Sequence, residues 1–204
     1  FVTELKTHGT ASYCGDGIFA YYYSSSKNSA RMTYCTARGE ILHFVKTQPF
    51  DSTLSFYNGV ALEETFVSES ADGESEYAYR FVDTSFNTVS SPAEAKDFRC
   101  GLFAVGNGHG KYGVTANGKA LLLPVEYDGV FGDENGIVAV KGSTAYAFDP
   151  DMKSLGTFDI GGDGLKNNVE AARIVSPDAV CFSTSYTDTF LLTTSGKKQF
   201  LYDF

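Results

Sequence analysis

The sequence predicts an all-β fold, a five-bladed β-propeller-like array with about four antiparallel strands per blade. Three observations lead to this prediction. A glycine-anchored phrase recurs along the chain, turn residues separate short strand-like segments, and the segment lengths fit five similar units. Repetition at roughly 40 residues is typical of arrays built from one small supersecondary unit.

The repeated phrase is a small turn residue followed by an aliphatic residue and alternating apolar residues. It begins at Gly17, Gly59, Gly101 and Gly136, at spacings of 42, 42 and 35 residues, and a weaker copy begins 42 residues later at Asp178. We therefore expect blades at about 17–58, 59–100, 101–135, 136–177, and 178–204 together with 1–16.

Each unit consists of short strand-like segments joined by tight turns. Segments such as 17–23, 31–35 and 41–45 are rich in the β-branched and aromatic residues that favour strands. A turn of the form Thr-x-x-Gly-charge recurs, for example at 36–40 and 115–119. The Thr oxygen can accept hydrogen bonds from nearby backbone N–H groups and Gly tolerates positive φ, so both residues favour hairpin turns.

A fourth, weaker strand is expected just before the next glycine, at 53–56, 129–131 and 171–175, and we assign it to the end of the preceding blade. The glycine-anchored strand is expected to be innermost, because small residues such as Ala104 let strands approach a crowded axis. No segment has convincing helical periodicity, and Pro92–Lys96 is expected to form one helical turn at most.

The two ends of the chain are expected to complete the last blade together. Residues 178–204 end after a third strand, and residues 1–16, with the apolar stretch Val2–Leu5, resemble the tail of a repeat. Together the two pieces have the length of one unit, and closure would remove exposed sheet edges. The alternatives are an open stack of hairpins and a piece of a longer array.

Composition narrows the classes of partner. The 204 residues are expected to form a single domain, because the repeats follow one another without a linker. The net charge is −9 and no cluster of Lys and Arg offsets it, so we expect no nucleic-acid or anionic-membrane partner. No apolar run approaches the ~20 residues that span a bilayer, so no membrane insertion of this segment is expected. Whether a targeting segment or further domains were removed stays open.

The four cysteines share no motif spacing. We expect them to be buried free thiols that act as small apolar residues. The alternative is one disulfide between Cys35 and Cys181, whose blades would become neighbours on closure.

No arrangement of residues predicts catalysis, a metal or a cofactor. The three histidines, His8, His43 and His109, lie outside any nucleophile elbow or metal-ligand spacing. The glycine-rich segment 106–110 is expected to be a hairpin rather than a dinucleotide-binding loop. Segment 159–164 is expected to be an acidic turn rather than a calcium loop.

A glycan-cleaving enzyme is the catalytic alternative, because such enzymes use pairs of carboxylates. Asp16 and the pairs Glu63-Glu64 and Asp133-Glu134 lie near the glycine-anchored strands. Blades this short leave little chain from which to build a substrate cleft, which favours a non-catalytic role.

The loops that enter the glycine-anchored strands are the predicted recognition site, because propellers place recognition on loops held by a rigid scaffold. The Asx-Gly pairs in these loops are also ordinary turn chemistry, and this interpretation stays open. The candidate binding residues are Asp16, Tyr57, Asn58, Arg99, Glu134, Asn135 and Asp178.

One stretch resembles a known family. Its motifs are Gly101–Val105, Gly110–Val114, Asn117–Lys119, Leu123–Val130 and Asn135–Val140. Residues 101–140 in this order resemble the bacterial WG (KWG) repeat, with Tyr112 at the position of the tryptophan. The resemblance implies a bacterial β-rich repeat protein, often in the cell envelope or secreted, with interaction roles and no established catalytic residues.

We therefore expect a non-catalytic recognition module for a protein or glycan ligand, located outside the cytoplasm of a bacterium. The alternatives are a glycan-active enzyme on a five-bladed scaffold and a purely structural spacer domain.

Overall fold

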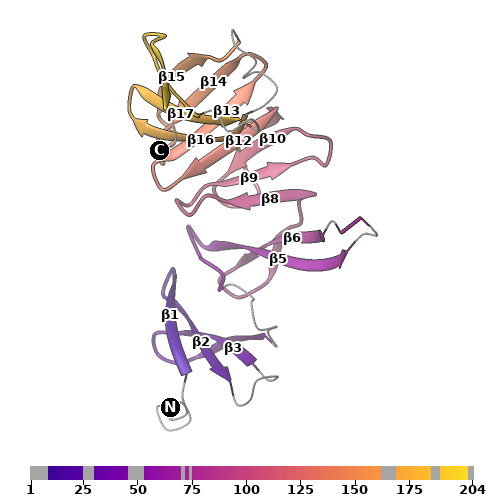
Figure 1. Ribbon diagram of the computed structural model, residues 1–204. Helices are drawn as coiled ribbons and strands as arrows, with labels where there is room; N and C mark the ends of the chain where they lie inside the picture. Colours follow the sequence, from indigo (N-terminus) through magenta and orange to yellow (C-terminus); the bar gives the residue numbers. More distant parts are fainter. Residues whose placement is uncertain are drawn as a thin grey trace. The chain divides into compact units, whose positions relative to one another are not determined.

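The computed structural model is all-β and describes residues 9–24, 30–45, 53–69, 72–73, 75–161, 169–184 and 189–201 (Figure 1). Its strands, β1 to β19, form five antiparallel sheets, four with four strands and one with three. The predicted fold class, the five units and the antiparallel pattern are therefore confirmed.

The chain divides into two compact units, Phe1–Ser91 and Pro92–Phe204, which are described in turn. The expectation of a single domain stays a prediction.

The first unit contains two sheets, and in each of them the spatial order of the strands follows their order along the chain. The first sheet has the order β1 (Gly9–Gly15), β2 (Ile18–Ser24), β3 (Ala30–Thr36) and β4 (Ile41–Val45). The second sheet has the order β5 (Val60–Glu69), β6 (Ser75–Asp83) and β7 (Thr88–Ser90).

The second unit contains three sheets. The third sheet consists of β8 (Glu94–Asp97), β9 (Phe103–Gly106), β10 (Tyr112–Thr115) and β11 (Leu121–Tyr127). The fourth consists of β12 (Gly129–Asp133), β13 (Gly136–Lys141), β14 (Thr144–Phe148) and β15 (Ser154–Asp159). The fifth consists of β16 (Val169–Ser176), β17 (Ala179–Thr184), β18 (Thr189–Thr193) and β19 (Lys198–Leu201).

The predicted blade boundaries are wrong by one strand. β1 pairs with β2, β12 with β13 and β16 with β17, so each strand before a repeated turn belongs to the following sheet. The physical reason is that a tight turn joins antiparallel neighbours, which must then hydrogen-bond to each other. In four sheets the repeated strand (β2, β9, β13 or β17) therefore lies second and has a neighbour on each side, whereas β5 is the first strand of the three-stranded sheet.

The predicted composite blade of 178–204 with 1–16 is corrected by the same pairing. The fifth sheet consists of β16 to β19, and β1 belongs to the first sheet. The predicted strand Val2–Leu5 lies outside the described residues. Two local expectations are also wrong: 53–56 carries no strand, and the possible helical turn at Pro92–Lys96 is largely replaced by strand β8.

Neighbouring sheets in each unit pack face to face, as blades do. In the first unit, Ile18, Ala20 and Tyr34 of the first sheet share a core cluster with Ala61 and Val82 of the second. Such packing hides one face of each sheet from water and supplies the main stabilising term.

The strand β13 at the centre of the second unit is covered on both faces. Ile137 and Ala139 join a core cluster with the third sheet, whereas Val138 and Val140 join a cluster with the fifth. Ile137, Val138 and Ala139 are each 0% exposed. A strand that is buried on both faces reads as a continuous apolar run, which is why this copy of the repeat is so apolar.

In the first unit the backbone before β5 meets the end of β1. The Phe56 N–H donates to the Cys14 carbonyl at 2.5 Å. Gly15 has φ +92°, and a Cβ there would overlap the Phe56 carbonyl oxygen. Gly17 has φ +76°, but a Cβ there would meet open space. At Gly15 a side chain would therefore meet both a left-handed backbone and a steric overlap, whereas at Gly17 it would meet the left-handed backbone alone.

We predict that Gly15→Ala destabilises the first unit by roughly 3 kcal/mol or more, because it adds a clash to a left-handed conformation. Gly17→Ala is the matched control and should cost only about 1–2 kcal/mol. Urea-dependent hydrogen exchange of the β2 and β3 amides measures both. Equal losses of stability would contradict the described contact between Gly15 and Phe56.

Candidate functional site

The predicted binding residues lie in or beside the turns that lead into β2, β5, β9, β13 and β17. Asp16 follows β1, Asn58 precedes β5, Arg99 lies between β8 and β9, Asn135 between β12 and β13, and Asp178 between β16 and β17. They fall into two groups, one in each unit.

In the first unit the structure brings the candidates together. The Gly59 N–H donates to Asp16 Oδ2 at 2.7 Å, which joins the two turns. Asn58 and Gly59 have φ +51° and +82°, the signature of a two-residue hairpin turn. Tyr57 flanks this turn, and its N–H donates to the Val60 carbonyl at 2.8 Å. Asp16, Tyr57 and Asn58 thus share one small surface.

In the second unit the turns of the third and fourth sheets also lie close together, since a Cβ at Gly132 would come within 3.2 Å of the Phe98 ring. Burial raises the pKa of the Cys100 thiol, and the nearby charges of both Asp97 and Asp133 raise it further. The Arg99 N–H donates to Asp97 Oδ1 at 2.7 Å, and the Asn135 N–H donates to Asp133 Oδ1 at 2.8 Å. These two carboxylates therefore hold the conformations of their own turns.

Asp97 and Asp178 illustrate the same use of carboxylates. Burial raises the pKa of Asp97, while the N–H and charge of Arg99 lower it less. Asp178 Oδ1 accepts from the Ser176 hydroxyl at 2.6 Å, and its carbonyl accepts from the Thr194 N–H at 2.9 Å. Turn formation accounts for these contacts, so ligand binding by the turns stays a prediction.

A different feature, which the sequence reasoning missed, is the outer part of the second sheet. β7 pairs with β6 only at Phe81 and Val82. Beyond these residues β5 and β6 continue as a two-stranded ribbon, visible in Figure 1. We call residues 63–69 and 75–80 the β5–β6 ribbon. A ribbon of two strands buries little of either face.

The ribbon carries three exposed large apolar side chains. Phe66 and Val67 are each 55% exposed and Tyr77 is 40% exposed. Phe66 lies opposite Tyr77, and their rings make an edge-to-face contact with centroids 6.0 Å apart. Val67 is the extra residue of a β-bulge, because the pairing passes from Phe66↔Tyr77 to Ser68↔Glu76. We call these three residues the ribbon cluster.

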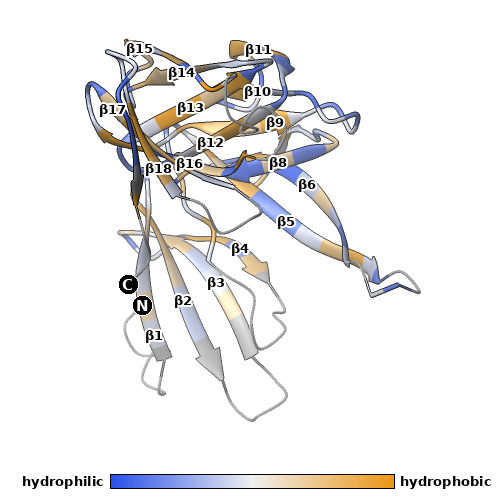
Figure 2. Cartoon of the chain, turned by 45° about the horizontal axis from the view of Figure 1, so that its top comes forward, coloured by the Kyte–Doolittle hydropathy of each residue, from blue (hydrophilic) through white to orange (hydrophobic). Residues whose placement is uncertain are grey.

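Carboxylates surround the ribbon cluster. Figure 2 shows a hydrophilic stretch of β5 followed by a hydrophobic one, in agreement with Glu63-Glu64 and then Phe66-Val67. The Glu63 carboxylate already has a partner within the ribbon, because Arg80 Nε donates to its Oε2 at 2.6 Å. Glu64 and Glu69 are exposed and form no ion pair with any residue that the structure describes.

The sequence held a signal for this site. The adjacent apolar pair Phe66-Val67 breaks the alternation expected of a half-buried strand and stands among Glu63, Glu64 and Glu69. Sequence patterns bring Glu63 and Glu64 into view only within the glycan-active alternative. The exposure of the two apolar side chains beside them was therefore not predicted.

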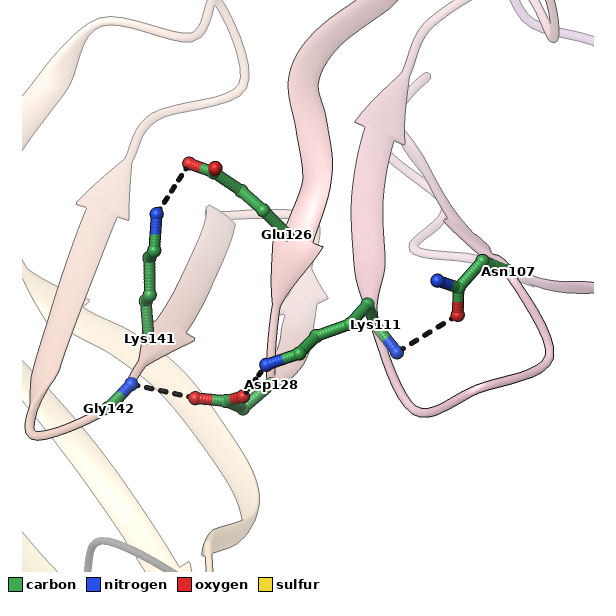
Figure 3. A network of polar contacts seen from close by, with 6 residues as sticks. All are labelled: Asn107, Lys111, Glu126, Asp128, Lys141 and Gly142. Carbon is green, nitrogen blue, oxygen red and sulfur yellow. Dashed lines mark hydrogen bonds and ion pairs between the residues drawn. The ribbon is translucent and has the colours of Figure 1, made fainter.

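The residues of the WG-like stretch form a polar network between the third and fourth sheets (Figure 3). Lys111 Nζ donates to Asp128 Oδ1, while Asp128 Oδ2 accepts from the Gly142 N–H at 2.7 Å. Asp128 thus joins the start of β10 to the turn between β13 and β14. A second pair, Lys141 Nζ and Glu126 Oε1 at 2.8 Å, lies beside it. We interpret the network as a structural link between sheets.

The same network lowers the pKa of the Asp128 carboxyl, chiefly through the hydrogen bond from Lys111 and then through that from the Gly142 N–H. A lowered folded-state pKa means that the contribution to stability is present above the unfolded-state pKa, and is lost as the pH falls through the folded-state value.

Among the residues that the structure describes, the histidines, the cysteines and segment 159–164 form no metal site. His43 stacks on Phe86 with ring centroids 4.6 Å apart, and His109 lies in the β9–β10 hairpin predicted for 106–110. His8 and most of 159–164 lie outside the described residues. The four cysteines are free thiols, Cys35 and Cys181 included. Within the described ranges no group of three His, Cys, Asp or Glu side chains could hold a metal.

No protein-family model and no curated protein sequence matches the chain. Among solved structures, Hsv2 of Kluyvelomyces marxianus matches with TM-score 0.45 and 8% identity, over 90% of this chain and 58% of Hsv2. BBS1N, solved in complex with ARL6DN, matches with TM-score 0.34 and 8% identity, over 91% of this chain and 78% of that one. PorZ, a surface component of the type-IX secretion system of Porphyromonas gingivalis, matches with TM-score 0.40 and 12% identity, over 95% and 32%.

The chain thus spans less than two thirds of Hsv2 and about a third of PorZ. In the part of the chain that the structure describes, no helix is long and apolar enough to cross a membrane.

We predict that Asp128→Asn lowers the stability of the second unit by about 1 kcal/mol at neutral pH, because an exposed ion pair and a charged turn acceptor are lost. The difference from wild type should shrink as the pH falls below ~4, because Asp128 is then protonated first in the unfolded state and, at lower pH, in the folded state, where its pKa is lowered. Urea unfolding at pH 7 and pH 3 measures the difference in unfolding free energy between the variant and wild type. Glu126→Gln, which removes one exposed pair, should cost less than about 0.5 kcal/mol. A pH-independent difference for Asp128→Asn would contradict this account.

Proposed function

We propose that the chain is a non-catalytic protein-recognition module that contacts its partner through the ribbon cluster. The observation that supports this proposal is the exposure of Phe66, Val67 and Tyr77 together on a two-stranded ribbon. None of the three core clusters formed by the described residues includes a residue of the ribbon. Adjacent exposed apolar side chains with a polar surround are typical of interaction sites.

The residue types suit a protein partner. Aromatic side chains are enriched at the centres of protein interfaces and often supply most of the binding energy. Three side chains are too few for a whole interface, which commonly buries ~1,200–2,000 Å² in total. The ribbon cluster would therefore be the centre of the contact, with the neighbouring glutamates at its rim.

The contacts argue against the glycan-active alternative. Glu63 is engaged by Arg80, and Asp16 holds the Gly59 N–H. Glu134 lies in the β12–β13 turn. Asp16 and Glu63, which already serve a turn and an ion pair, are poorly suited to act as an acid and a nucleophile.

The setting of the module follows from the WG-like stretch. Its resemblance to a bacterial repeat supports membership of that family and a place in the cell envelope or among secreted proteins. Fractionation of the native cells tests the location. Recovery of the chain from the cytoplasm alone would overturn it.

We predict that the double change Phe66→Ser with Tyr77→Ser abolishes recognition without unfolding the chain, because both side chains are exposed. The probe is a displayed library of random peptides selected on the wild-type chain. Selected peptides should bind the double variant at least tenfold more weakly, about 1.4 kcal/mol.

The matched control is Leu121→Ser with Leu122→Ser, which changes two neighbouring side chains on β11 that are 50% and 46% exposed. This variant should bind like wild type. Failure to select any peptide, or equal binding to both double variants, would contradict the proposal. Binding to a glycan array that is lost in the Phe66/Tyr77 variant would replace the protein ligand by a glycan.

A further inference from the structure

We infer that the ribbon cluster recognises a basic segment of its partner, with Arg or Lys side chains placed next to apolar ones. This inference rests on the proposed function and adds the chemistry of the partner to it.

The strand register places two carboxylates beside the aromatic pair on one face of the ribbon. Side chains two residues apart on a strand point to the same face. Glu64 therefore shares a face with Phe66, and Phe66 pairs with Tyr77 across the ribbon. Beyond the bulge, Glu69 pairs with Ser75, which shares the face of Tyr77. Glu64 and Glu69 thus flank the pair of rings from either side.

The two glutamates are available to a partner. Both are exposed, and neither forms an ion pair with a described residue. Arg80 is the one basic residue in the sequence of the ribbon ranges, and its register partner is Glu63 on the opposite face. This face of the ribbon therefore presents two carboxylates and two exposed aromatic side chains, and no basic residue of the ribbon lies on it.

That combination favours a cation attached to an apolar segment. A guanidinium or ammonium gains from a carboxylate and also from the negative face of an aromatic ring. The chain uses the same chemistry internally, since Lys198 Nζ lies 4.0 Å from the centroid of the Phe190 ring. An acidic partner would be repelled, and the net charge of −9 adds to that repulsion.

Addition of a partner strand to the edge of β5 fits less well. Val67 forms a bulge, and bulges interrupt the regular hydrogen-bond ladder that a new strand would need. The contact is therefore expected through side chains on the face of the ribbon.

The experiment uses a peptide of alternating Arg and Val, and the same peptide with citrulline in place of Arg. Citrulline keeps the shape and most of the hydrogen bonding but has no charge. The Arg peptide should bind the wild-type chain at least tenfold more tightly than the citrulline peptide. Its affinity should fall as salt rises from about 50 to about 500 mM, because exposed charges are screened.

Variants of the two glutamates test which carboxylates bind the Arg peptide. Glu64→Gln and Glu69→Gln should each weaken binding of the Arg peptide about threefold, and the double variant about tenfold. Glu76→Gln is the matched control, because Glu76 lies on the same ribbon but on the other face. It should change the affinity less than twofold. Circular dichroism checks that each variant is folded, and the citrulline and salt comparisons need no variant.

The outcomes separate the two proposals. If selected peptides depend on Phe66 and Tyr77 but show no excess of Arg or Lys, and the glutamate variants bind as wild type does, the basic partner is wrong and the proposed function stands. If no peptide depends on Phe66 and Tyr77, the proposed function fails as well. Equal binding of the Arg and citrulline peptides would also overturn the inference.

Discussion

The fold depends on burial of the second strand in the sheets of the second unit. β13 shows this most clearly, because Ile137 and Ala139 pack toward the third sheet while Val138 and Val140 pack toward the fifth. β9 is likewise buried throughout, and β17 over its first four residues. A strand covered on both faces cannot slip by one residue without exchanging its two sets of contacts, so burial fixes the register as well as the stability. The turns and the polar network of this unit are held by these strands.

The same strands show which parts of the fold could be predicted from the sequence. The glycine-anchored apolar runs correctly predicted the strands, the five units and the all-β character of the described residues, because strand periodicity and turn chemistry are local properties. The prediction that each fourth strand ends the preceding blade is wrong, because an Asx-Gly pair forms a tight hairpin and not a loop between blades. The hydrogen bonds of the Asn58-Gly59 turn show it to be a hairpin, which makes its flanking residues neighbours. Pairing between strands is not local, and the residue types at the turn were the only clue to it.

The candidate site divides in the same way. Asp16, Tyr57 and Asn58 do come together, as their equivalent positions in the repeat suggested. What the sequence could not reveal is that Asp97, Asp133 and Asp178 use their side chains to hold turns. Nor could it reveal that the ribbon extends beyond the end of β7 and beyond the core clusters, where Phe66 and Tyr77 are exposed. Exposure depends on a missing neighbour, and that is a property of the assembled sheet.

The central claim is that the ribbon cluster is uncovered in the chain itself and is free for a partner. Hydrogen exchange of the intact chain, resolved by residue or short peptide, tests it most directly. The account predicts slow exchange for β9, β13 and β17 and fast exchange for the outer halves of β5 and β6, because amides there have few buried contacts. Protection of residues 65–69 and 75–78 equal to that of β13 would mean that another part of the chain covers the ribbon, and would contradict the claim.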